Sequence, residues 1–142
     1  MATVRFHLAF PVRDIVQTKA YYADGLGCGV GRENAKSIIL ELYGHQLVAH
    51  VTNQDLEPQK SIYPRHFGLV FSEESEWEAL CDRVRQKQIS FYSEPKRRFE
   101  GSVLEHRTFF LADPFHNLME FKFYCHDEAI FGAIEQGAIG DA

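Results

Sequence analysis

The chain has only three cysteines among its 142 residues, and they lie far apart in the sequence. Cys28, Cys81 and Cys125 form no CxxC pair, and an odd number leaves at least one thiol unpaired. We therefore expect reduced, partly buried thiols. Neither a disulfide scaffold nor a thiolate zinc site is indicated.

Long apolar runs are also missing. No stretch approaches the roughly 20 apolar residues that a membrane-spanning helix needs, and residues 1–7 show no apolar leader core or cleavage pattern. We therefore expect a cytoplasmic protein. The net charge is −5, and the basic run Lys96-Arg97-Arg98 is too short to change the balance. Neither nucleic acid nor an anionic membrane is an expected partner.

Two common signatures of chemistry are absent as well. The sequence contains no GxSxG nucleophile motif. Its glycine-rich stretch, Gly25–Gly31, follows a predicted helix instead of opening one, so it is a poor phosphate cradle. With 45% hydrophobic and 25% charged residues, the chain is typical of one globular domain with a real core. Twelve Phe and six Tyr favour strand-rich packing.

The expected elements occur in the same order twice. One helix is predicted over Asp14–Asp24, between a capping Asp14 and Gly25. The other is predicted over Ser75–Gln88, which opens with the capping-box pattern Ser75-Glu76-Trp77-Glu78. Each helix follows one short strand and precedes about three more. The expected strands are Val4–Phe10, Gly27–Glu33, Ser37–Leu42, Gln46–Thr52, Arg65–Phe71, Ile89–Glu94, Leu104–Ala112 and Leu118–Tyr124.

This order predicts a single α+β domain over residues 1–142, built from two βαβββ modules at about 4–53 and 65–125. The polar stretch Asn53–Pro64 would link them. The two modules are also similar in sequence, since Gly44–Ala49 resembles Phe115–Glu120. The second copy is longer, and the polar segment Ser93–Val103 would hold the extra residues. The tail, 126–142, is expected to contain a short helix around Glu128–Glu135.

Three strands each place one candidate metal ligand on their polar face. Because side chains alternate along a strand, His7, His66 and Glu120 each point away from the apolar residues of their own strand. A curved sheet would turn the three faces into one cup. Two imidazoles and a carboxylate are the ligand set of non-haem Fe(II) sites and also suit Mn(II), while Zn(II) or Ni(II) remain possible.

These features resemble the vicinal oxygen chelate superfamily, which contains glyoxalases, bleomycin-resistance proteins and extradiol dioxygenases. The matching blocks are Phe6–Val12, Tyr21–Gly27, Arg65–Gly68 and Asp113–Phe121. The resemblance implies a curved, cup-shaped mixed sheet with helices on the outside and metal ligands at His7, His66 and Glu120. More narrowly, Gly44–His50 looks like a subfamily described as extradiol-type dioxygenases by prediction.

A fourth position separates the activities of this superfamily. Glyoxalase-like members typically carry a second Glu on the last strand of the first module, where the repeat alignment puts Ala49. A shift of one residue puts His50 there instead, as a fourth ligand or near-site group, and both registers stay open. Tyr124 shares a face with Glu120, so it either meets substrate at the rim of the cup or lies solvated at the strand end.

Other polar residues carry weaker signals. Arg97 and Arg98 could clamp a carboxylate by bidentate pairing, although a solvated loop is the favoured interpretation. His106 and His126 have no supporting pattern.

The leading hypothesis is a metal-dependent extradiol dioxygenase with His50 and Tyr124 as candidate catalytic groups. It would chelate vicinal oxygens of a small catechol-like substrate on Fe(II) or Mn(II), with the metal as Lewis acid and template. The alternatives are a glyoxalase-like lyase or isomerase and a non-catalytic small-molecule binder. We also expect a homodimer, because the sheet edges have no other obvious cover.

Overall fold

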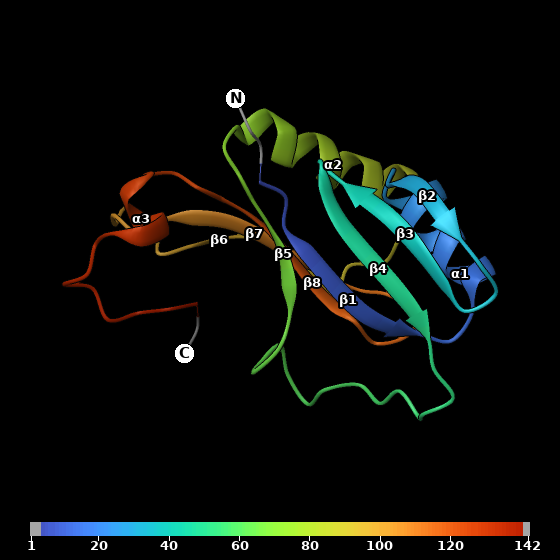
Figure 1. Cartoon of the computed structure of the whole chain (residues 1–142). Helices are drawn as coiled ribbons and strands as arrows, with labels where there is room; N and C mark the ends of the chain where they lie inside the picture. Colours follow the sequence, from blue (N-terminus) through green and yellow to red (C-terminus); the bar gives the residue numbers. More distant parts are fainter. Residues whose placement is uncertain (1–3, 141–142) are drawn as a thin grey trace.

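The computed structural model describes residues 4–140, and its elements follow the expected order (Figure 1). The first module contains β1 (His7–Val12), α1 (Ile15–Lys19), the π-helical η1 (Ala20–Gly25), β2 (Gly29–Glu33), β3 (Ser37–Leu42) and β4 (His45–Val51). The second module contains β5 (Phe67–Phe71), α2 (Glu74–Gln86), β6 (Ser93–Arg98), β7 (His106–Ala112) and β8 (Leu118–Tyr124). The tail contains α3 (Glu128–Phe131).

Each module forms a four-stranded mixed sheet of the same topology. The strand orders are β1-β4-β3-β2 and β5-β8-β7-β6, with one parallel pair, β1–β4 or β5–β8, in each sheet. The predicted duplication and the α+β fold are therefore confirmed. In the second sheet, β8 lies between β5 and β7, so Glu120 occupies an inner strand.

The predicted N-terminal cap is present in α1 but not in α2. The Asp14 carboxylate accepts a 2.7 Å hydrogen bond from the amide of Gln17, which confirms the predicted cap of α1. The capping box predicted for α2 is wrong: Glu73 is its N-cap residue, and Glu73 makes no side-chain cap bond. The apolar stripe of α2 is buried as its spacing predicts, and Trp77 donates to the carbonyl of Phe121 at 2.7 Å.

The apolar faces of both sheets and the helices share one core. Phe10, Val12, Leu40, Phe109 and Phe121 are among its buried members. Alternation therefore leaves the other face of each sheet for polar side chains, as expected.

Side chains from the two modules also meet directly. β1 and the β5–β8 pair lie near the centre of the molecule (Figure 1), where the rings of Phe10 and Phe67 are 5.7 Å apart. The Asn117 side-chain amide donates to the carbonyl of Pro11 at 2.8 Å. The structure thus joins the two repeats into one unit.

The predicted strand at Ile89–Glu94 and the loop at Ser93–Val103 are misplaced. Ile89 and Phe91 pack against the core, and β6 begins only at Ser93. β6 pairs with β7 alone, at the edge of the sheet. Charged side chains suit an edge strand, because they discourage pairing with another chain, so the basic run Lys96-Arg97-Arg98 is strand and not loop.

The register that would turn Ala49 toward the metal is also wrong. Ala49 is fully buried in the hydrophobic core. Strand pairing shows which residue of the first module corresponds to Glu120. In β1–β4, Val48 pairs with Ala9, two residues after His7, and in β5–β8, Glu120 pairs with Gly68, two residues after His66. With His7 equivalent to His66, the counterpart of Glu120 is Val48.

Candidate metal centre

His66 and Glu120 meet on the polar face of the second sheet. His66 lies directly before β5, and Glu120 lies in the neighbouring β8. The distance from His66 Nε2 to Glu120 Oε1 is 3.1 Å. Glu120 is 6% exposed, so its carboxylate is removed from bulk water. An ionised carboxylate in such a place needs compensation by donors or a cation.

The remaining atoms of both side chains are held by further hydrogen bonds. Nδ1 of His66 lies 2.8 Å from the carbonyl oxygen of Ile62, which can only accept, so Nδ1 carries the proton. The hydroxyl of Thr108 donates to Oε2 of Glu120 at 2.6 Å. The two atoms left facing each other, Nε2 and Oε1, are both lone-pair donors. A metal ion placed beside them would accept a lone pair from each.

This arrangement fits the requirements of a divalent metal. Ligating imidazoles commonly donate their other N–H to a carbonyl, and ligating carboxylates are hydrogen-bonded in turn. Ile62 and Thr108 supply those contacts here. His66 Nε2 and Glu120 Oε1 therefore have the chemistry of two metal ligands.

His7 has the same kind of support but lies elsewhere. Its Nδ1 is 2.7 Å from Gln46 Oε1 in the adjacent strand β4, which leaves Nε2 for another partner, and the side chain is exposed. Within residues 4–140, no three His, Cys, Asp or Glu side chains are grouped so as to hold a metal ion. Within one chain, the structure therefore brings together His66 and Glu120 but not His7.

His50 lies in β4 of the first sheet, with its side chain exposed. It pairs with Pro11, four residues along β1 from His7, which corresponds to about 13 Å of strand. His50 and His7 therefore cannot bind the same ion, although both lie on the polar face of that sheet.

Tyr124 belongs to a row of side chains across the second sheet. Arg98, His106 and Tyr124 are consecutive partners on β6, β7 and β8, and the rings of His106 and Tyr124 are 5.0 Å apart. Lys122 lies between Tyr124 and Glu120, with Nζ 3.8 Å from Glu120 Oε1 and 5.1 Å from the centre of the Tyr124 ring. The predicted common facing of Glu120, Lys122 and Tyr124 is confirmed.

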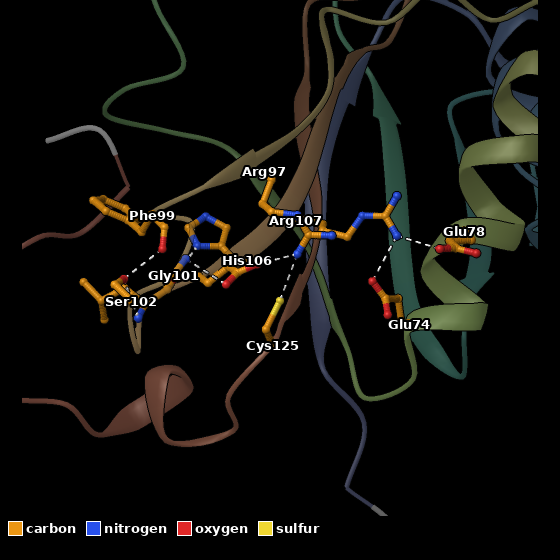
Figure 2. Close-up of polar contacts among 11 residues, drawn as sticks. Glu74, Glu78, Arg97, Phe99, Gly101, Ser102, His106, Arg107 and Cys125 are labelled. Carbon is orange, nitrogen blue, oxygen red and sulfur yellow. Dashed lines mark hydrogen bonds and ion pairs between the residues drawn. The ribbon is translucent and has the colours of Figure 1, made fainter.

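Thr108 and His106 were not predicted as residues of the site. Both lie on the polar face of β7, at alternate positions of a strand that was expected, and both are buried. Figure 2 shows His106 pointing away from α2, whereas its neighbour Arg107 extends toward Glu74 and Glu78 of that helix. Strand alternation alone would have identified them as neighbours of Glu120.

Arg97 and Arg98 occupy opposite faces of β6. The Arg97 guanidinium forms a 2.6 Å ion pair with Glu105 and lies 3.4 Å from the sulfur of Cys125 (Figure 2). Arg98 is buried on the polar face, with its guanidinium carbon 5.9 Å from the centre of the Phe110 ring. The expectation of a loop is therefore wrong for both residues, and the expectation of a solvated side chain is wrong for Arg98 but not for Arg97, which is exposed.

Among the described residues, no helix is long and apolar enough to cross a membrane. No protein with a curated description matches the sequence.

Solved structures with the same fold are numerous. A glyoxalase/bleomycin resistance protein/dioxygenase from Alicyclobacillus acidocaldarius is 41% identical, with a TM-score of 0.85 over 90% of this chain and 96% of that one. The fosfomycin resistance protein FosX from Listeria monocytogenes is 16% identical, with a TM-score of 0.66 over 91% and 99% of the two chains. Lactoylglutathione lyase from Agrobacterium tumefaciens is 15% identical, with a TM-score of 0.64 over 86% and 94%. The last two show the fold alone.

The sequence also matches a family model over residues 5–121, which takes in both modules almost completely. The chain belongs to the Glyoxalase/Bleomycin resistance protein/Dioxygenase superfamily.

Proposed function

We propose that the protein is a metal-dependent oxidoreductase of the extradiol dioxygenase type, acting on a small catechol-like substrate. The observation that carries this proposal is the 3.1 Å approach of His66 Nε2 to Glu120 Oε1. Two histidines and one carboxylate suit Fe(II) or Mn(II) and leave several coordination positions open. When bound, the metal supplies a Lewis acid and a place where vicinal substrate oxygens and dioxygen can meet.

The third ligand in this proposal is His7 of a second copy of the chain. His7 is exposed, its Nδ1 is engaged by Gln46, and its Nε2 is directed to no partner among the described residues. Superfamily members bind small molecules and often form dimers. A homodimer that seats His7 of each copy against His66 and Glu120 of the other would complete two equal sites.

The protein's own groups would then bind and orient the substrate. Thr108 fixes the carboxylate of Glu120 so that one oxygen is presented. The ammonium of Lys122, next to that carboxylate, would stabilise an ionised substrate hydroxyl. Tyr124 lies beyond Lys122 and would contact the substrate at the rim, and an exposed His50 would approach it from the first sheet of the partner.

Metal and oxygen measurements test this function. Protein purified without oxygen should bind about one Fe(II) or Mn(II) per chain and consume oxygen with members of a catechol panel. A Zn(II)-loaded sample controls for redox-inert binding. Isomerisation of a methylglyoxal–glutathione adduct without oxygen consumption would instead identify a glyoxalase-like lyase, and ligand binding without any metal would identify a binding protein.

Mixed dimers test the shared site. His7→Ala and His66→Ala should each abolish metal binding in a homodimer, while His126→Ala, an exposed histidine, should not. In a dimer containing one chain of each variant, one of the two sites regains the whole ligand set. Metal bound at about half of the wild-type amount supports ligands from two chains, and no recovery would overturn that arrangement.

A further inference from the structure

A cavity of about 370 Å³ opens beside the candidate metal centre, between the second sheet and the tail. His106, Lys122 and Tyr124 form its floor, and Leu104 and Ile130 are among its apolar walls. Lys122 Nζ also lies 3.8 Å from Glu120 Oε1, so one residue of the cavity lining contacts the site described above. Its size suits a small molecule, and its lining is the usual mixture of many apolar and few polar groups.

One polar atom of the residues that line this cavity is unusual. His106 is 3% exposed, and its Nε2 is shielded from solvent with no hydrogen-bond partner among the described residues. A buried polar atom of this kind costs free energy, on the order of 1–3 kcal/mol, unless a partner arrives. Among the described residues nothing packed against His106 compensates Nε2, so its remaining partner is a bound water or an atom of a ligand.

The hydrogen bonding of the ring fixes what that ligand atom must be. Nδ1 of His106 lies 2.9 Å from the carbonyl oxygen of Leu104, so Nδ1 carries a proton. Burial lowers the pKa of His106, and the nearby charges of Lys122 and Arg98 lower it further, against the opposing effects of the Leu104 carbonyl and Glu120. The ring is then neutral, and Nε2 is a bare acceptor that requires an O–H or N–H donor.

The tail forms the opposite wall of the cavity. Residues 129–134 and 138–140 line it, and α3 lies beside the ends of β6 and β7 (Figure 1). Gly140 approaches the linker closely: a Cβ at this position, where φ is +58°, would lie 2.6 Å from the hydroxyl oxygen of Tyr63. Glycine thus permits the close approach of the tail to Tyr63.

We propose that this cavity binds a phenolic substrate ring, with a hydroxyl of the ring donating to His106 Nε2. His106 is in this view the residue that selects a hydroxylated ring, while the apolar walls accept its carbon skeleton. The inference rests on the proposed function for the identity of the site and its substrate class, and it adds the cavity that holds the ring and the residue that recognises its hydroxyl.

The test uses metal-free full-length protein, so that chelation by a metal cannot contribute. The probes are 4-methylcatechol and its dimethyl ether, 3,4-dimethoxytoluene, which has the same skeleton without a donor. Calorimetry should show that wild type prefers the catechol about tenfold, as one hydrogen bond predicts. His106→Asn keeps a donor for the Leu104 carbonyl but has no acceptor at the Nε2 position, so the preference should vanish. His126→Asn is the matched control.

A second readout follows the atom itself. In protein labelled with ¹⁵N at histidine, the Nε2 resonance of His106 should report an unprotonated nitrogen and should shift on addition of 4-methylcatechol but not of the ether. Equal affinity for both probes, an unchanged preference in His106→Asn, no binding, or an unmoved resonance would each overturn the proposal. If the protein prefers 4-methylcatechol over the ether but consumes no oxygen with the catechol panel, the dioxygenase proposal is rejected and the binding proposal stands.

Discussion

The hydroxyl of Tyr22 donates a 2.6 Å hydrogen bond to Oδ2 of Asp113, and both residues are buried where the two modules meet. Asp113 also accepts hydrogen bonds from the amides of Phe115 and Asn117 and from the Asn117 side chain, each at 2.8 Å. Burial raises the pKa of Asp113, and these donors partly oppose the rise. Tyr22 therefore stabilises a carboxylate that ties the loop before β8 to the first module.

Tyr22→Phe should lower the free energy of unfolding by about 2 kcal/mol at neutral pH, because a buried carboxylate loses a donor. A raised pKa means that folding favours the protonated acid, so stability falls as pH rises through the folded-state pKa of Asp113. The loss in the variant should be smaller below about pH 4, where the acid is protonated in both states. Urea unfolding at both pH values measures this, and an equal loss at each would show that Asp113 is not responsible.

Gly68→Ala should weaken metal binding without changing a ligand. A Cβ at Gly68 would overlap the carbonyl oxygen of Glu120, its partner in β8. The strands must separate, and His66 then moves away from Glu120. Titration with Mn(II) should show a clear loss of affinity in a folded protein. Gly137→Ala, where an added Cβ meets nothing within 4 Å, is the control and should bind metal as wild type does.

Thr108→Val should reduce metal affinity about 10- to 100-fold, the usual effect of removing a partner of a ligating carboxylate. The variant keeps the shape of the side chain but removes the 2.6 Å hydrogen bond to Oε2 of Glu120. Thr52→Val, directly after β4, is the matched substitution and should leave the affinity unchanged. If both variants bind metal equally well, Thr108 does not orient Glu120.

Ala49→Glu and His50→Ala should separate the two faces of β4. A carboxylate at Ala49 would enter the hydrophobic core, and burial of that charge should cost at least about 3 kcal/mol. His50 is exposed, so its removal should change stability by less than about 0.5 kcal/mol. Thermal unfolding of both variants provides the comparison. A stable Ala49→Glu protein with tightened metal binding would contradict the register seen here.

Strand alternation predicted the polar facing of His66 and Glu120 correctly, because the period of two depends only on backbone geometry. The position of Ala49 was not predictable from the repeated letters. A two-residue turn, Tyr43-Gly44, joins β3 to β4, whereas five residues, Asp113–Asn117, join β7 to β8. Alignment from the turn therefore slips by one residue, and one residue reverses the face. Whether His7 approaches Glu120 depends on the packing of whole sheets, on which local periodicity carries no information.

After a duplication, one of the two copies can lose functional residues while the other keeps them. Both sheets keep the same strand order, yet only the second carries a carboxylate on its inner parallel strand, where the first carries Val48. Apart from His7 and His50, selection on the first module would then act through its contribution to folding, and selection on the second through chemistry. New substrate preferences should accordingly arise by substitutions in β6, β7, β8 and the tail. The first module would meanwhile continue to support the core that both modules share.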